Sequence, residues 1–345
     1  MDIGCLKRAG WLACLAGMLA VHAAVAGVDA MTGQGSVKQV CVGQFVLELP
    51  ASAKVEVAGS YKGIEVERHM ATDFDAIVAA LRVRADEYGA RKVEQDPYAA
   101  AIYRSGGVDP DGLFGESQLL GFDADQSRQV AVLGYHKQSG SPEITVEVHR
   151  ILDQARHVFS VDNLGADKYL AVRDSVLRAS GRYRPLAPGE VPDGPGFCVG
   201  TGLFEDESAR DVGGDATLVA QFPEYSNVSF SVDVSGIAQV AREGGLQSRV
   251  DSDLGFLATV ASGARTLRRG QKRYASQDGY LIAVSVEDDE GRVQKFFWGT
   301  DGVPNDSRQP LVEIQLVAGE SGPSPLTDAE MGELWDRLLE GFRLR

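Results

Sequence analysis

Apolar and polar residues alternate along many short segments of this chain, and these segments follow one another in a similar order in its two halves. Alternation at every second residue is typical of half-buried strands. In the first half the pattern predicts strands over 45–49, 64–67, 118–122, 130–136, 144–151 and 157–161. In the second half it predicts strands over 216–222, 228–234, 264–267, 280–287, 293–298 and 311–316.

Apolar residues three and four positions apart predict two helices in the first half. One helix runs from a cap at Thr72 to the glycine at Gly89, and the other covers residues 166–180. Gly181 follows this second helix directly, as is common at helix C-termini.

Two further helices are expected in the second half, over 246–262 and at the end of the chain. Thr327 and Glu330 form a capping box, which marks the start of the terminal helix. Its apolar residues make one continuous stripe, which we interpret as a surface packed in the core. The stripe consists of Met331, Leu334, Trp335, Leu338, Leu339 and Phe342.

The two halves begin with a related phrase, CVGQF at 41–45 and CVGTGLF at 198–204. Both phrases are followed by elements in the order ββαββββα. The sequence therefore predicts an α+β protein of two tandem related domains, each an antiparallel sheet backed by helices on one face. Residues 184–196 contain four prolines and three glycines, which indicates a semi-rigid linker between domains over 27–183 and 197–345.

Residues 1–26 have the features of a secretory signal peptide. Lys7 and Arg8 precede an uncharged apolar stretch, and an A-x-A site ends at Ala26. We therefore predict export, cleavage after Ala26 and a periplasmic location. An uncleaved membrane anchor would need a longer apolar stretch, and a lipoprotein would need a better lipobox than the one before Cys14.

The net charge narrows the classes of partner. The formal charge of the chain is −15, and removing the leader's +1 leaves −16. Such a charge disfavours nucleic acid and anionic lipid as partners, and it favours either solubility or a basic protein partner. Glu287, Asp288, Asp289 and Glu290 are expected at a hairpin tip, either as a solvated turn or as an acidic contact for such a partner.

Motifs for catalysis or cofactor binding are missing from the sequence. There is no G-x-S-x-G and no H-E-x-x-H, and the glycine-rich stretch at 263–272 lacks the spacing and the Ser/Thr of a P-loop. No second His or Cys stands at metal-ligand spacing, so we interpret the mature histidines as packed or solvated. These are His69, His136, His149 and His157. A pair of carboxylates acting as acid and base stays open.

Cys41 and Cys198 are the cysteines that remain after removal of the leader. They occupy equivalent places in the two halves, and thiols of exported proteins are commonly bonded. We therefore predict a Cys41–Cys198 disulfide. The alternative is two small buried residues, each packed at the start of its own domain.

With these motifs in order, the chain resembles periplasmic immunity proteins that protect bacteria from lipases injected by type VI secretion. The resemblance is strongest to the two-domain family cognate to phospholipase effectors of the fourth class, and it covers nearly the whole mature chain. It rests on CVGQF with LP at 49–50, GFCVG at 196–200, FFWG at 296–299 and LWD at 334–336. Residues 89–118 fit the family pattern poorly.

The resemblance implies a binder whose two α+β domains grip the lipase effector, so that substrate cannot enter. It implies no catalytic residue and no cofactor, and after cleavage of the leader no stable membrane insertion is expected. A binder of another exported ligand and an uncharacterised periplasmic enzyme are the competing functions.

Overall fold

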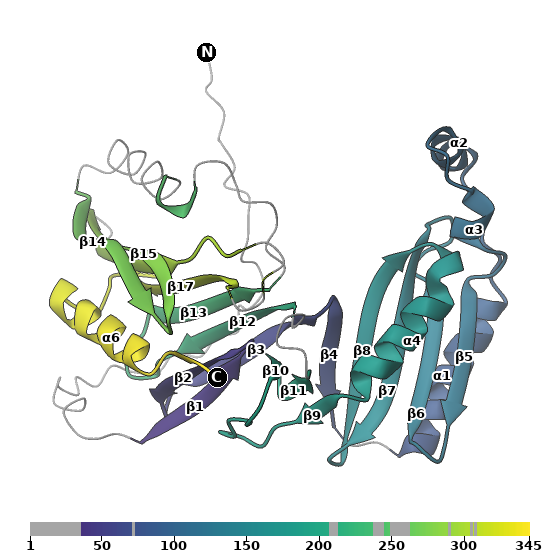
Figure 1. The fold of residues 1–345 in the computed structure, drawn as a ribbon, viewed down its shortest axis with the longest axis horizontal. Coiled ribbons are helices and arrows are strands. Elements are labelled where there is room, and N and C mark those ends of the chain that lie inside the picture. The colour runs from purple at the N-terminus through teal and green to yellow at the C-terminus, as the bar shows by residue number, and fades with distance from the viewer. Residues whose placement is uncertain are drawn as a thin grey trace. The chain divides into compact units, whose positions relative to one another are not determined.

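One antiparallel sheet of twelve strands runs through both halves of the chain in the computed structural model (Figure 1). The structure describes residues 36–70, 73–206, 213–236, 245–248, 263–288, 291–303, 306 and 309–345. Across the sheet the strands are β14 (Arg265–Tyr274), β15 (Gln277–Asp288), β16 (Gly291–Gly299), β17 (Leu311–Ala318), β13 (Val228–Ser235), β12 (Gly214–Gln221), β3 (Lys54–Tyr61), β4 (Ile64–His69), β8 (Ala155–Leu164), β7 (Glu143–Leu152), β6 (Val130–His136) and β5 (Leu119–Asp125).

The order of this sheet is the same from its centre outward in both directions. At the centre β3 pairs with β12, with Lys54 opposite Gln221 and Tyr61 opposite Gly214. Beyond them follow β4, β8, β7, β6 and β5 on one side, and β13, β17, β16, β15 and β14 on the other. Adding nine to a strand's number in the first half therefore gives its counterpart in the second half.

Two small sheets contain the remaining strands of the described residues. One contains β1 (Val37–Val42), β2 (Phe45–Pro50) and β18 (Arg343–Leu344), and the other contains β10 (Gly196–Val199), β11 (Gly202–Glu205) and β9 (Tyr183–Pro185). The predicted order ββαββββα is therefore incomplete, because each half opens with four strands and ends with a short one. All of β10 and most of β11 are buried, so these strands show no alternation of apolar and polar residues.

The described helices have at most 16 residues, and some of them are capped by side chains. They are α1 (Phe74–Gly89), α2 (Pro97–Ser105), α3 (Pro110–Phe114), α4 (Tyr169–Ser180) after a 3₁₀ turn at Ala166–Lys168, and α6 (Asp328–Glu340). The capping box at Thr327 and Glu330 is confirmed, because each side chain accepts a hydrogen bond from the other residue's backbone N–H. At α1 the predicted cap is wrong, since Asp73 is the N-cap and makes no side-chain cap bond. Thr72 lies outside the described residues.

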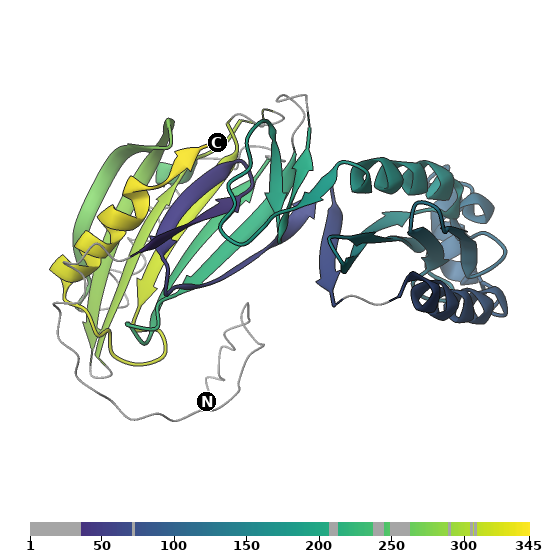
Figure 2. The same ribbon diagram turned by 90° about the horizontal axis from the view of Figure 1, so that it is seen from below.

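In the first half, α1 and α4 cover opposite faces of the sheet (Figure 2). Apolar residues of α1 pack against Ala131 and Leu133 of β6. Tyr169 of α4 lies against Gly134 of the same strand, where a Cβ would come within 2.1 Å of its ring. Neighbouring strand residues point to opposite faces. The prediction of helices on one face is therefore wrong for this half.

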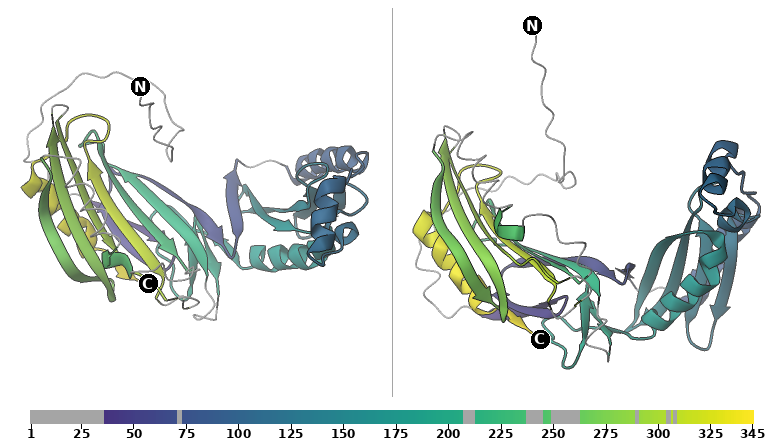
Figure 3. Two further views of the ribbon diagram at one scale, coloured as in Figure 1. Left: turned by 90° about the horizontal axis from the view of Figure 1, so that it is seen from above. Right: turned by 45° about the horizontal axis from the view of Figure 1, so that its top comes forward.

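In the second half, α6 covers one face of the sheet (Figure 3). The interpretation of its apolar stripe as core is confirmed, since Trp335 is fully buried with its ring 5.7 Å from that of Phe296. For the predicted helix over 246–262, residues 245–248 are helical and residues 249–262 lie outside the described residues.

The proline-rich stretch over 184–196 is held by contacts within itself and with neighbouring residues. Arg184 forms ion pairs with Glu190 at 2.6 Å and with Glu205 at 3.2 Å. Leu186 packs against the buried cluster around Cys41 and Cys198. Val37–Arg345 form one compact unit, so the division into domains over 27–183 and 197–345 stays a prediction.

Candidate functional site

The structure brings the cysteines of the two opening phrases together in a disulfide. Cys41 of β1 and Cys198 of β10 are bonded, with their Cα atoms 5.8 Å apart. Both residues are buried and form a small apolar cluster with Leu203. Beside the bond, Gly43 and Cys198 exchange backbone hydrogen bonds of 3.0 and 2.8 Å. The bond therefore joins the hairpins that open the two halves.

The predicted acidic site lies at the turn between β15 and β16. Asp288 pairs with Gly291 at the end of this hairpin, as expected for a tip. The side chain of Glu287 is exposed and lies 3.5 Å from Arg292, an ion pair of little strength at such exposure. Asp289 and Glu290 lie outside the described residues, as does the side chain of Asp288. The role of this hairpin in partner binding stays a prediction.

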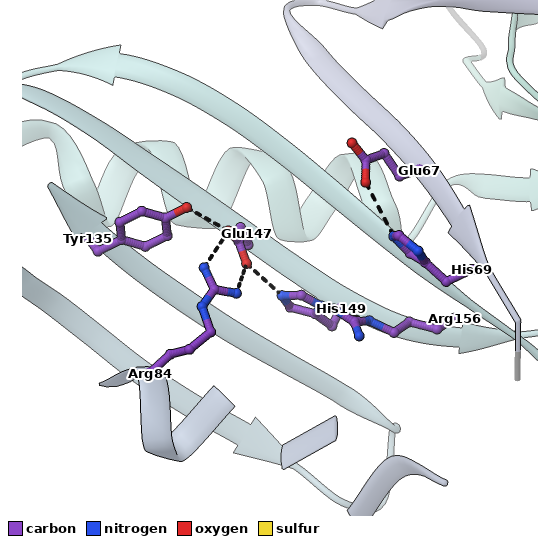
Figure 4. A network of polar contacts seen from close by, with 7 residues as sticks. All are labelled: Glu67, His69, Arg84, Tyr135, Glu147, His149 and Arg156. Atoms are coloured by element: carbon purple, nitrogen blue, oxygen red, sulfur yellow. Dashed lines mark hydrogen bonds and ion pairs between the residues drawn. The ribbon is translucent and has the colours of Figure 1, made fainter. Parts of the chain in front are cut away.

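A network of polar side chains ties α1 to the sheet (Figure 4). Glu147 of β7 is its centre and is largely buried. The two carboxylate oxygens each accept a 2.9 Å hydrogen bond from the Arg84 guanidinium of α1, and one also accepts from the Tyr135 hydroxyl at 2.7 Å. His149 Nε2 lies 3.0 Å from the other oxygen, and Arg156 donates to His149 Nδ1 at 3.3 Å.

These contacts fix the protonation states of the network. Because His149 Nδ1 accepts from Arg156, the ring proton lies on Nε2 and is donated to Glu147. Burial raises the pKa of Glu147, but hydrogen bonds from His149, Arg84 and Tyr135 outweigh it and hold that pKa well below its usual value. Burial lowers the pKa of His149. A charged Glu147 with all its donors in place serves to hold α1 on the sheet.

The four histidines singled out in the sequence have different surroundings. His69 is half-exposed beside Glu67. His136 and His157 are fully buried, His136 with Nδ1 3.1 Å from the Ser141 carbonyl oxygen. Among the described residues, no group of His, Cys, Asp or Glu side chains is arranged to hold a metal ion.

An exposed apolar face on α2 was not anticipated. Tyr98 and Ile102 are four residues apart, so they lie on the same side of the helix, and they are 76% and 53% exposed. Ala100 is the one buried residue of α2. The signal that reveals α2 and α3 is an aspartate before a proline: Asp96 and Asp109 each cap the helix that starts at the next residue.

Residues 190–345 match the protein-family model described as "Tle cognate immunity protein 4 C-terminal domain". This part of the chain belongs to that immunity family. The matched range starts inside the proline-rich stretch and includes everything from β10 to β18. No curated protein matches the chain. In the part of the chain that the structure describes, no helix is long and apolar enough to cross a membrane.

Solved structures extend the similarity to most of the chain. The apo immunity protein TplEi of the type VI secretion system of Pseudomonas aeruginosa matches with a TM-score of 0.73 at 19% identity, over 90% of this chain and 97% of that one. A Tle4–Tli4 complex gives the same values. TplEi complexed with an "L" peptide gives a TM-score of 0.68 at 20% identity, over 90% and 98%. The chain thus shares their fold.

Proposed function

We propose that this protein binds a lipase effector of the type VI secretion system and blocks it, which protects the cell that makes both. The observation that carries this proposal is the family match over residues 190–345. The shared fold with a protein crystallised as a Tle4–Tli4 complex supports it. The protein acts as an inhibitor by binding and not as an enzyme, in keeping with the missing hydrolase motifs.

Export to the periplasm is part of this proposal, since the leader directs the protein there. The features of a signal peptide, with cleavage after Ala26, support it. Residues 1–26 lie outside the described residues, so N-terminal sequencing of protein from the periplasm is the direct test.

A duplicated architecture is the second part of the proposal, with related domains over 27–183 and 197–345 on either side of the stretch at 184–196. The matching strand order on the two sides of β3 and β12 supports it. The shared opening phrases of the two halves add sequence support. Two related domains offer two contact regions, and a stable complex should bury about 1,600 Å² or more in total.

Two surfaces are proposed for contact with the effector. The acidic hairpin with Glu287, Asp288, Asp289 and Glu290 speeds association with a basic patch, because charge complementarity acts mainly on the rate of encounter. The α2 face with Tyr98 and Ile102 provides apolar anchors, which contribute more to retention.

Co-expression with a Tle4-class lipase directed to the periplasm tests the function. The mature protein should restore growth and should co-elute with the lipase on gel filtration. A double change of Tyr98 and Ile102 to serine should shorten the lifetime of the complex, and Val83→Ser on the exposed surface of α1 is the matched control. Undiminished toxicity together with no complex would exclude the immunity function.

A further inference from the structure

The hairpin that opens the first half completes the core of the second half. Its strand β2 pairs with β18 at the end of the chain, with Phe45 opposite Leu344. The fully buried Phe45 ring is stacked 4.9 Å from that of Phe342, which in turn lies 6.4 Å from the ring of Trp298 in β16. Helix α6 also contacts β2.

The hairpin that opens the second half does the reverse. Its strand β11 pairs with β9 at the end of the first half, with Phe204 opposite Tyr183. The buried Phe204 ring is stacked 4.5 Å from Tyr61 of β3 and lies 6.2 Å from Phe159 of β8. The two opening hairpins, 37–50 and 196–205, are therefore exchanged between the halves.

The exchanged hairpins meet at one place, where the disulfide lies. The bond between Cys41 and Cys198 is accompanied there by the two backbone hydrogen bonds between Gly43 and Cys198. Arg345 at the chain end also holds both hairpins, because its backbone N–H donates to the Gln44 carbonyl and its guanidinium to the Gly196 carbonyl at 2.7 Å. The disulfide is the covalent bond across this crossing.

We propose that the Cys41–Cys198 bond is a redox latch that fixes the exchanged hairpins, and that the chain reaches its effector-binding form only once the bond has formed. The part about the effector rests on the proposed function. In the reducing cytoplasm both thiols persist, and after export a protein disulfide of a periplasmic thiol oxidase accepts their electrons. One cysteine thiolate attacks that disulfide and the second displaces the oxidase, so two thiols lose two electrons and two protons while the oxidase disulfide becomes a dithiol.

Because the hairpins are exchanged, a substitution in the opening hairpin of one half should destabilise the other half. Phe45→Ala and Phe204→Ala are matched variants, since both rings are fully buried. By hydrogen exchange of the mature protein, Phe45→Ala should lower protection at least tenfold in α6 and β16, and leave β6 and β7 unchanged. Phe204→Ala should do so in β8 and β9 and leave α6 unchanged. A loss of protection confined to the half that carries the substitution, or an equal loss of protection everywhere, would contradict the exchange of hairpins between the halves.

Reduction of folded wild-type protein tests the latch, and the Cys41→Ala/Cys198→Ala double variant provides a second preparation. Loss of the bond should lower hydrogen-exchange protection at least tenfold in β2, β18, β9 and β11, and weaken binding to an inactivated Tle4-class lipase at least tenfold. Reoxidation should restore both. Unchanged protection overturns the latch, and unchanged affinity overturns its control of binding. If oxidised protein does not bind the lipase, the proposed function is wrong. The hydrogen-exchange measurements would still test the latch in that case.

Discussion

Acidification is expected to destabilise the protein through one buried histidine. His157 in β8 is fully buried, with its ring 5.4 Å from that of Tyr183. In the described structure neither ring nitrogen has a hydrogen bond of normal geometry, and the backbone of Leu152 interacts with the ring only weakly. Burial lowers the pKa of His157 to about 4, helped by the positive charge of Arg68 and opposed by the weaker effect of Asp153. The folded state therefore keeps this ring neutral at pH values where an exposed histidine is charged.

The sign and size of the effect follow from that difference. A histidine in the unfolded chain takes up a proton as the pH falls through about 6.5. Between that pH and about 4 the unfolded state binds one more proton than the folded state at this position, so the free energy of unfolding falls with decreasing pH. One pKa unit corresponds to about 1.4 kcal/mol, so this residue alone removes about 3 kcal/mol between pH 7 and pH 4.

Urea unfolding of wild-type protein and of His157→Leu, at pH values from 7 to 4, measures this contribution. Leucine fills a similar volume and cannot titrate, so its stability advantage over wild type should grow by about 3 kcal/mol over the range. His69→Gln is the control, because His69 is half-exposed, and it should follow wild type. A constant difference between wild type and His157→Leu would refute the reasoning.

Three further changes test other parts of the structure. Arg84→Met removes two hydrogen bonds from the buried Glu147 and should lower the free energy of unfolding in urea by about 3 kcal/mol. The same substitution should cost less in a Glu147→Gln background, and equal losses in the two backgrounds would contradict the coupling of the two residues. Because the pKa of Glu147 is lowered from about 4.5, its stabilisation should decline progressively as the pH falls below that value, and should be lost fully only below the lowered pKa. Glu287→Lys with Asp288→Lys should slow association with the lipase mainly at low salt in stopped-flow measurements, and a slowing that is independent of salt would argue against electrostatic steering. Gly134→Ala leaves no room beside α4 and should cost about 2 kcal/mol in thermal or urea unfolding, whereas a neutral effect would show that α4 can shift.

The sequence was sufficient for the elements that lie with one face toward solvent. Strand β13 alternates buried and half-buried residues along its whole length, so its pattern reveals it. Helix α6 has both a capping box and an apolar stripe. By contrast, β10 is buried throughout, and a short apolar run does not show whether it is a strand.

The exchange of hairpins could not be predicted from the sequence. The pairing of β2 with β18 joins residues almost 300 positions apart, as the ion pair of Glu48 with Arg343 also shows. Either half could have paired its closing strand with its own opening hairpin, and the local pattern would have been the same. The cysteine pair could be proposed because the repeated phrases place Cys41 and Cys198 at equivalent positions. The phrases do not tell which strands lie beside them.

The pairing of the two closing strands makes the topology of this chain almost circular. Ten residues connect the end of β9 at Pro185 to the start of β10 at Gly196. The strand β9 closes the first half and is followed by β10, which opens the second half. In the same way, β18 closes the second half, so a connection from Arg345 back to Val37 at the start of β1 would be equivalent to that stretch. A permuted chain that begins at residue 190, runs through such a connection and ends at residue 189 would keep every strand pair described above. The fold therefore does not dictate the position at which the polypeptide starts.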